Sequence, residues 1–258
     1  MVHAFEVSDL HFSIGQTVIL HPLSLAFAPG RVHGLIGHNG SGKSSLLRLL
    51  ARQHEVYAGQ IRYGTKDLRD WKNRPLAREV AYLPQQPPST DGMTVEELVA
   101  LGRYPWHGPL GRLGTEDRAK VREAMILTDV AVFAQRAVDS LSGGERQRAW
   151  LAMLVAQDSK WLLLDEPTSA LDVGHQIEVL RLVRQLSESR RLGVVMVLHD
   201  VNMALRFCDD IVALRAGRLL VDAPAEQFSD PDFLEEIYGV PMGIVVRPDN
   251  LGSISFPL

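Results

Sequence analysis

Short apolar runs that end in polar or glycine-rich segments dominate the hydrophobic pattern of this chain. Three of them, Val32–Ile36, Trp161–Leu164 and Val194–Leu198, have the length and composition of strands buried on both faces of a parallel sheet. A helical pattern over about Val173–Ser189 separates the last two runs. The sequence therefore predicts strand–helix–strand units and an α/β fold built on a parallel sheet.

The ends of the chain carry other patterns. The first thirty residues alternate loosely between apolar and polar positions around a turn signal at Gly15-Gln16, which predicts short antiparallel strands. Near the other end, Ile211–Leu214 and Leu219–Val221 flank a glycine-containing turn, so we expect a hairpin there. The last segment, from about Gly239, contains three prolines and little periodicity, and we interpret it as an irregular tail packed on the surface.

The middle of the chain, from about residue 86 to 140, is helical but irregular. Thr94 and Glu97 have capping-box spacing, in which each side chain bonds the backbone amide of the other residue at a helix start. Prolines and glycines between 105 and 114, Pro109 among them, predict a loop, and Glu116–Leu127 predicts a second helix. A longer helix is expected after Ser142.

Composition and charge narrow the class of protein. The 258 residues are 46% apolar and 22% charged, values that exclude a disordered or fibrous chain and fit one domain with a smaller subdomain. The net charge of −4 gives no electrostatic reason to expect a nucleic-acid partner. The single cysteine, Cys208, cannot form an internal disulfide, which fits a reducing compartment. No apolar stretch approaches the ~20 residues of a membrane span, and we expect a soluble intracellular protein.

The segment Gly37–Ser44 matches the phosphate-loop pattern G-x-x-x-x-G-K-[ST], with a predicted strand before it and a helix after it. Its glycines let backbone N–H groups turn toward an anion, and the helix presents its positive end to the same phosphates. We predict that Lys43 contacts the β- and γ-phosphates and that the Ser44 hydroxyl ligates Mg²⁺. The alternative is a flexible loop with a surface lysine. The predicted nucleotide contacts are Gly37, Asn39, Gly40, Ser41, Gly42, Lys43, Ser44 and Ser45.

Two acids, Asp165 and Glu166, follow the strand Trp161–Leu164 directly. Ligands of open α/β sheets bind at the carboxyl ends of strands, so we expect this pair beside the phosphate loop. Strand alternation points the two side chains in opposite directions. We predict that Asp165 reaches Mg²⁺ and that Glu166 orients and deprotonates an attacking water. The alternative is that the acids only cap a strand where it meets solvent.

The segment Leu141–Gln147, L-S-G-G-E-R-Q, precedes the predicted long helix. Ser142 is a candidate N-cap, and Gly143 and Gly144 expose the backbone, so this helix start is a second place suited to an anion. Taken alone, the segment is better explained as a capping loop with no ligand. Its presence in one chain with a phosphate loop makes it the most diagnostic feature of the sequence.

Together these motifs resemble the nucleotide-binding subunits of ABC transporters. The segments that carry the resemblance are Gly37–Ser44, Leu83-Pro-Gln85, Leu141–Gln147, Leu162–Glu166, Ser169-Ala-Leu-Asp172 and Leu198-His199-Asp200, and their order and spacing match over essentially the full length. The stretches Gly102–Gly108, Leu141–Ser159 and Tyr238–Gly243 are similar to the ATPases of iron–siderophore importers, above all those of the ferric hydroxamate type.

The resemblance implies an α/β fold with a P-loop (RecA-like) ATPase core, an N-terminal antiparallel β subdomain and an inserted α-helical subdomain. It places the core and its β subdomain at residues 1–85 and 158–240, the helical subdomain at 86–157 and a C-terminal tail at 241–258. A head-to-tail homodimer would sandwich two ATP molecules, with Mg²⁺, between the phosphate loop of one copy and the signature segment Leu141–Gln147 of the other.

The resemblance also assigns roles to single residues. Gln85 would ligate Mg²⁺ and relay the nucleotide state, Asp172 would bridge the two sites, and His199 would contact the γ-phosphate. The catalytic residues would be Glu166, His199 and Gln85, the metal ligands Ser44, Gln85 and Asp165, and the further nucleotide contacts Ser142, Gly143, Gly144, Glu145, Asp172 and Ile14.

Two positions depart from the family pattern. Most members stack adenine on an aromatic side chain near the first strands, and alignment places Ile14 there, with Phe12 as a neighbouring aromatic able to substitute. The signature segment has Glu145 where many members have glutamine, which adds an acceptor near Arg146.

The function implied is ATP hydrolysis that energises uptake of an iron–siderophore complex across the cytoplasmic membrane. The chain would be a peripheral protein on the cytoplasmic face of the bacterial inner membrane, docked through residues 86–140 on integral permease subunits. An extracytoplasmic siderophore-binding protein would take part indirectly, and no nucleic acid is expected as a partner.

Other functions fit parts of the pattern. Haem and cobalamin importers use similar ATPases, so the cargo stays open among these classes. A soluble ABC-type ATPase acting on nucleic acid or ribosomes would carry a long coiled-coil insertion or two motif sets, and neither is present. If the chain were a P-loop kinase or GTPase, the presence of Leu141–Gln147 and His199 would be a coincidence. A regulatory module that binds nucleotide without hydrolysing it is disfavoured by the Asp165-Glu166 pair.

Overall fold

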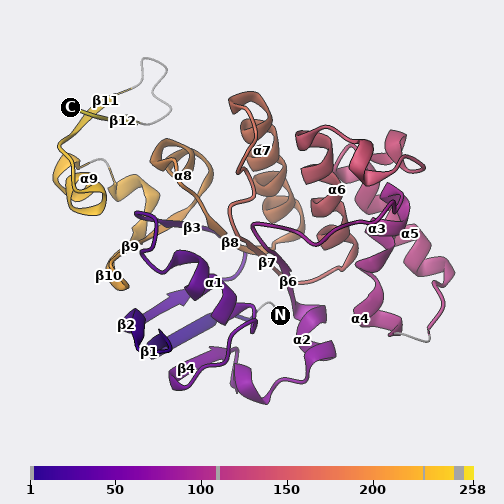
Figure 1. Ribbon diagram of the computed structural model, residues 1–258, viewed down its shortest axis with the longest axis horizontal. Helices are drawn as coiled ribbons and strands as arrows, with labels where there is room; N and C mark the ends of the chain where they lie inside the picture. Colours follow the sequence, from indigo (N-terminus) through magenta and orange to yellow (C-terminus); the bar gives the residue numbers. More distant parts are fainter. Residues whose placement is uncertain (1–2, 109–110, 229, 247–252) are drawn as a thin grey trace.

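A six-stranded sheet lies at the centre of the structure, a computed structural model that describes residues 3–108, 111–228, 230–246 and 253–258 (Figure 1). Its strands follow the order β10-β9-β3-β8-β7-β6. Their bounds are β3 Val32–Ile36, β6 Val80–Leu83, β7 Trp161–Leu164, β8 Gly193–Val197, β9 Asp210–Arg215 and β10 Arg218–Pro224. All pairs are parallel except β9 with β10, so the predicted α/β fold, its parallel sheet and its late hairpin are confirmed.

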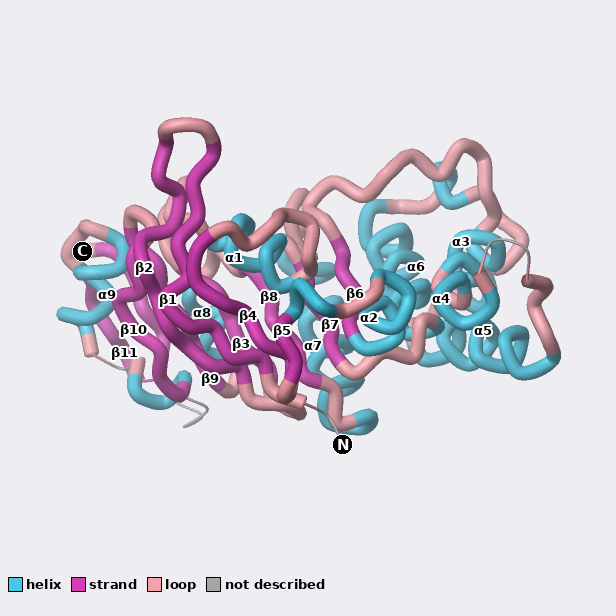
Figure 2. The backbone as a smooth tube through the Cα atoms, turned by 90° about the horizontal axis from the view of Figure 1, so that it is seen from below, coloured by secondary structure: helices cyan, strands magenta, loops and turns pink. Residues whose placement is uncertain are grey.

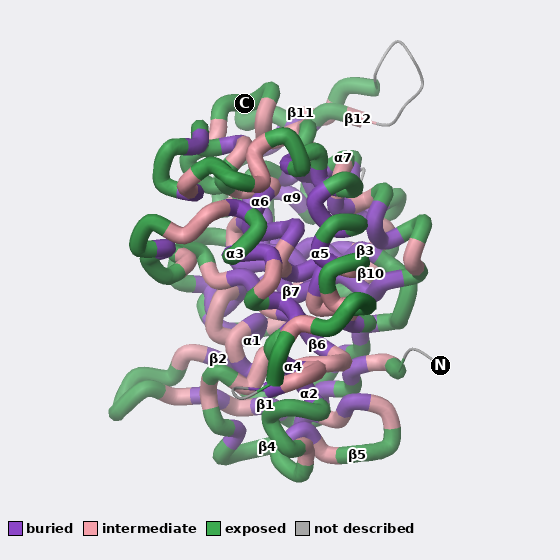
Figure 3. The backbone as a smooth tube through the Cα atoms, turned by 90° about the vertical axis from the view of Figure 1, so that its right-hand side faces the viewer, coloured by how far each residue is buried: buried purple, intermediate pink, exposed green. Residues whose placement is uncertain are grey.

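The central strands are continuous apolar runs because both of their faces are covered. Every residue of β3, β7 and β8 is buried. Alternate side chains enter two different cores: Leu162 and Leu164 belong to one, and Leu163 belongs to the other. Buried segments accordingly gather in the middle of the molecule (Figure 3). This two-sided burial is the reason that the runs lack an alternating polar pattern.

A second sheet covers one face of the first. It is a four-stranded antiparallel sheet of order β2-β1-β4-β5, with bounds β1 Phe5–Ile14, β2 Thr17–Phe27, β4 Ala58–Tyr63 and β5 Lys66–Asp67. Helix α1 (Lys43–Leu50) packs in the core between the two sheets through four fully buried leucines. The predicted β1–β2 hairpin is present with longer strands than expected. Strands β4 and β5 have no predicted counterpart, because polar residues and Gly59 interrupt their apolar pattern.

Helices cover the opposite face and form a separate group at one end of the molecule (Figure 2). Helices α7 (Val173–Arg190) and α8 (Val201–Phe207) pack on the sheet through the larger core. The end group consists of α3 Val95–Leu101, α4 Tyr104–His107, α5 Thr115–Leu127 and α6 Gly143–Ala156. The capping box at the start of α3 is present, with the Thr94 amide donating to the Glu97 carboxylate at 2.8 Å.

Two expectations about irregular segments need correction. Helix α4 forms inside the predicted loop, because Pro105 occupies the first helical turn, where its missing N–H is not needed; Pro109 lies outside the described residues. The chain after Gly239 is not irregular either, since β11 (Met242–Val246) and β12 (Ser253–Pro257) pair antiparallel beyond helix α9 (Pro231–Tyr238). Their β-branched and aromatic residues favour strands despite the flanking prolines.

The segment 102–108 ties the helical group to the rest of the chain. Arg74 and Arg78, both on α2 (Asn73–Glu79), donate to the carbonyl oxygens of Pro105 and Trp106 at 2.8–3.3 Å. The Trp106 ring also lies within about 5 Å of the guanidinium groups of Arg78 and Arg103, a cation–π geometry. The division into subdomains at 85/86 and 157/158 stays a prediction, and this segment is one contact that would cross it.

The close approach of α3 and α6 depends on Gly102. A Cβ at this position would collide with the carbonyl oxygen of Met153 on α6. Gly102→Ala is expected to lower the free energy of unfolding by about 1–3 kcal/mol, measured by urea denaturation, because the two backbones must separate. Gly174→Ala is the control: its Cβ would lie 3.4 Å from the nearest atom, and the change should stay within about 0.5 kcal/mol. Equal losses in the two variants would contradict the packing argument.

Candidate functional site

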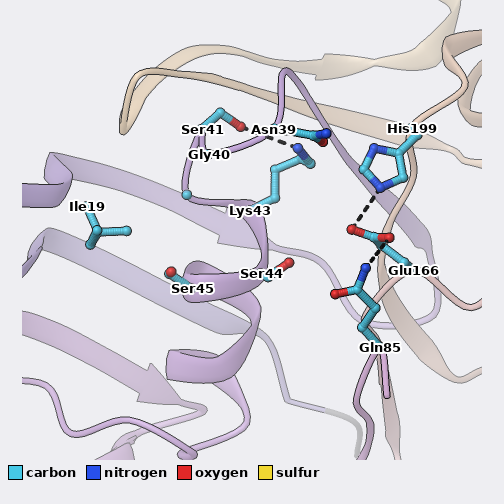
Figure 4. A pocket seen from close by; sticks show the side chains of 11 residues that line it. Ile19, Asn39, Gly40, Ser41, Lys43, Ser44, Ser45, Gln85, Glu166 and His199 are labelled. Atoms are coloured by element: carbon cyan, nitrogen blue, oxygen red, sulfur yellow. Dashed lines mark hydrogen bonds and ion pairs between the residues drawn. The ribbon is translucent and has the colours of Figure 1, made fainter. Parts of the chain in front are cut away.

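Four neighbouring parallel strands end at the same edge of the central sheet, and candidate residues follow each of them. The phosphate loop follows β3, Gln85 follows β6, the pair Asp165-Glu166 follows β7 and His199 follows β8. A cavity of about 410 Å³ opens there (Figure 4). It is lined by Ile19, Asn39, Gly40, Ser41, Gly42, Lys43, Ser44, Ser45, Gln85, Glu166 and His199.

The phosphate loop wraps around the ammonium group of Lys43. Lys43 Nζ donates to the carbonyl oxygens of Gly37 at 2.7 Å and His38 at 2.8 Å. The backbone needs glycine at Gly37 and Gly42, whose φ angles are +134° and +99°. Burial lowers the pKa of Lys43. The negative charges of Glu166 and Asp165 raise this pKa, but by less than burial lowers it. The loop therefore holds a partly desolvated cation beside free space.

Ser44 and Asp165 form an oxygen-rich pair at the base of the cavity. The Ser44 hydroxyl donates to Asp165 Oδ1 at 2.7 Å, and Arg48 Nη2 lies 3.5 Å from Oδ2. Asp165 is only 1% exposed. Burial raises the pKa of this carboxyl, and the contacts from Ser44 and Arg48 lower it in part. Hydroxyl and carboxylate oxygens are ligands that suit a hard divalent cation.

Glu166 is the point where the other strand ends converge. Gln85 Nε2 donates to Glu166 Oε2 at 2.6 Å, and His199 Nε2 lies 2.7 Å from Oε1 (Figure 4). The backbone of Glu166 has a φ of +52°, a left-handed conformation that is unfavourable for a residue with a side chain. Its neighbours thus keep the carboxylate in one place at the mouth of the cavity.

Apart from Ile14, the other candidate residues lie in a second group, which we call the signature cluster: Ser142, Gly143, Gly144, Glu145 and Asp172. They form the starts of α6 and α7, and none of them lines the cavity described above. Asp172 accepts from the backbone amide of His175 at 3.0 Å as the N-cap of α7. One chain therefore carries two separate groups of candidate residues.

Glu145 completes a capping box at the start of α6. The Ser142 amide donates to Glu145 Oε2 at 2.8 Å, and the Glu145 amide donates to Ser142 Oγ at 3.4 Å. The expected role as an acceptor near Arg146 is wrong, because Arg146 donates instead to the carbonyl oxygens of Asp139 and Leu141. Glutamate at this position thus stabilises the helix start.

The two residues expected to contact the base near the first strands do not line the cavity. Ile14 is 56% exposed near the β1–β2 turn and does not line the cavity. Phe12 cannot substitute, since it is buried and stacks on His54 with ring centroids 5.2 Å apart. Ile19 on β2 lines the cavity instead (Figure 4). A lone isoleucine in a strand carries no signal that would have identified it from the sequence.

Comparison with known proteins agrees with this geometry. A family model described as ABC transporter matches residues 20–169. The chain belongs to the ABC transporter family. It is 36% identical over 247 residues to the iron(3+)-hydroxamate import ATP-binding protein FhuC of Bacillus subtilis (strain 168), covering 96% of this chain and 92% of that protein. It is 40% identical over 248 residues to the petrobactin import ATP-binding protein FpuD of Bacillus anthracis, covering 96% and 91%.

The fold also matches a solved ABC transporter. A structure in an inward-facing conformation superposes with a TM-score of 0.88 at 26% identity, over 100% of this chain and 98% of the other. As a member of this family, the ABC transporter subunit described here binds ATP and is an ATP hydrolase coupled to transport. In the described part of the chain, no helix combines the length and apolar character that crossing a bilayer requires.

The buried Asp165 should lower the stability of this ABC subunit at neutral pH. Its pKa is raised in the folded chain, so stability is lost as the pH rises from the ordinary carboxyl pKa through the raised value. Asp165→Asn removes this charge, and we expect a gain of about 1 kcal/mol, or about 2–4 °C in Tm, in calorimetry without nucleotide.

Asp139, whose pKa is shifted in the opposite direction, serves as the control. Hydrogen bonds from Thr90 and Gly92 lower the pKa of Asp139, so Asp139→Asn should reduce Tm under the same conditions. A lower Tm for Asp165→Asn would show that its hydrogen bonds outweigh the burial of its charge.

Proposed function

We propose that this chain is the ATP-hydrolysing subunit of an importer that takes up a ferric siderophore of the hydroxamate type across the cytoplasmic membrane. The observation that carries the proposal is the Glu166 carboxylate, held by Gln85 and His199 across the cavity from the phosphate loop. The import functions named for the relatives above support the cargo class. The chain would sit as a peripheral subunit on the cytoplasmic face of the membrane.

The residues of the cavity divide the work of phosphoryl transfer. The triphosphate of ATP would lie along the loop, where Lys43 exchanges its carbonyl partners for the β- and γ-phosphates. Glu166 would orient the attacking water and accept its proton. His199 would contact the γ-phosphate and hold the water from the other side, since its imidazole already bonds the Glu166 carboxylate. Ile19 would supply an apolar contact on the far side of the cavity.

Ser44 and Asp165 carry oxygen donors suited to a Mg²⁺ ion, and Gln85 would be its third ligand from this chain. The Ser44 hydroxyl and the Asp165 carboxylate are 2.7 Å apart, and oxygen donors of these types suit this metal. When bound, the ion would neutralise negative charge on the phosphates of the nucleotide. Gln85 stands between the ATP site and the helices that begin at Val95, so its position would relay the nucleotide state to the docking surface at 86–140.

A second copy of the chain would complete each ATP site. The start of α6 carries a positive helix end, a capping Ser142 and two glycines, which suit the γ-phosphate held by the other copy. Glu145 and Asp172 would lie in the same interface. Integral permease subunits would dock on residues 86–140, and an extracytoplasmic binding protein would deliver the cargo to them.

Glu166→Gln tests the role of the carboxylate as base. The variant keeps the side-chain size but replaces one acceptor oxygen by an NH2 group and cannot take a proton, so steady-state ATP hydrolysis by the complex should fall by about 10²–10⁴-fold. Binding of ATP, measured by equilibrium dialysis, should stay close to that of the unchanged chain. Hydrolysis at an undiminished rate would refute the assignment of Glu166.

Transport by reconstituted vesicles tests the cargo. The chain would be assembled with its permease and binding protein, and uptake of a ferric hydroxamate, a ferric catecholate, haem and cobalamin would be compared, with Glu166→Gln as the inactive control. We expect ATP-dependent accumulation of the ferric hydroxamate. Accumulation of haem or cobalamin alone would assign the subunit to another importer class, and failure to assemble with any membrane protein would favour a soluble ABC-type ATPase.

A further inference from the structure

The two helix starts of the signature cluster touch through His175. A Cβ at Gly144 would lie 2.5 Å from His175 Cδ2 and 3.0 Å from Cγ, so the imidazole ring lies directly against the Gly144 backbone. Leu171 approaches Gly143 in the same way, 3.3 Å from the corresponding Cβ position. The first turn of α7 and the loop before it therefore pack on the first turn of α6.

His175 also holds the carboxylate of Asp172. His175 Nδ1 lies 2.8 Å from Asp172 Oδ2, and the His175 amide donates to Oδ1 at 3.0 Å. Both contacts lower the pKa of Asp172 and keep it ionised. The His175 side chain thus connects Gly144 at the start of α6 with Asp172, the N-cap of α7.

We propose that His175 is a positioning residue that joins the signature segment to Asp172, so that both meet the ATP bound by the second copy as one rigid unit. This inference rests on the proposed function, since it requires a head-to-tail dimer. His175 does not line the cavity of its own chain, so it acts through Gly144 and Asp172. A preordered pair of helix starts has less freedom to lose when the dimer closes, which favours closure.

The test uses the full chain carrying Glu166→Gln, in which bound ATP is not consumed. Dimer formation with saturating ATP is measured by analytical ultracentrifugation over a range of protein concentrations. Adding His175→Ala should raise the dimer dissociation constant by about tenfold or more, because the ring contact with Gly144 and the Nδ1 contact with Asp172 are both lost while the backbone amide still caps Asp172. His175→Asn keeps a donor near the Nδ1 position but vacates the ring contact with Gly144, so its effect should be intermediate.

Two further measurements separate positioning from a general structural role. Affinity for ATP at concentrations where the chain is monomeric should change less than about twofold in His175→Ala, because the phosphate loop is untouched. Gln185→Ala, an exposed position nearly three turns along the same helix, is the matched control and should change neither quantity.

The outcomes are distinct. Dimerisation of the His175→Ala variant as tight as that of its Glu166→Gln parent would overturn the inference and leave the proposed function intact. An equal loss of monomer ATP affinity would also overturn it, since the residue would then support the fold as a whole. If the Glu166→Gln parent itself stays monomeric with ATP, the head-to-tail dimer is refuted and the inference falls with it.

Discussion

The site depends on one constraint of the fold: four parallel strands of a fully buried sheet end side by side at one edge. Because β3, β8, β7 and β6 are neighbours, segments far apart in the sequence deliver Lys43, His199, Glu166 and Gln85 to one cavity. Glu166 leaves its strand with a left-handed backbone, which costs conformational energy. The bonds to Gln85 and His199 offset part of that cost, so the carboxylate is held in place before any substrate arrives.

The same burial makes the charges of the site unfavourable until they meet opposite charges. Lys43 and Asp165 each have a pKa moved toward the neutral form, in both cases mainly by desolvation. Lys43 donates to loop carbonyl oxygens, and Asp165 accepts from the Ser44 hydroxyl and forms an ion pair with Arg48 at 3.5 Å. A triphosphate with its metal would supply the missing counter-charges. The buried charges at this edge of the sheet therefore lower the stability of the empty protein and favour binding of the nucleotide.

The sequence predicts those elements whose formation depends on residues close together in the chain. The buried strands, the Thr94–Glu97 cap and the phosphate loop depend on neighbouring residues, and the pattern predicts them. Strand β4 and the C-terminal hairpin depend on partners far away, since Asn202 of α8 holds β12 through Ser255. The position of Ile19 in the cavity likewise follows from how the second sheet packs over α1 and carries no local signal.

At the start of α6, the capping box between Ser142 and Glu145 stabilises the helix and still leaves polar groups free to bind an anion. The Glu145 carboxylate accepts a hydrogen bond from the Ser142 amide, and Ser142 Oγ accepts one from the Glu145 amide. A hydroxyl that accepts one hydrogen bond still has its own hydrogen to donate. The capping box therefore orients Ser142 as a donor and leaves other first-turn amides of the helix for an anion. A glutamate at position 145 strengthens the helix start without occupying the groups that a phosphate from a second copy would need.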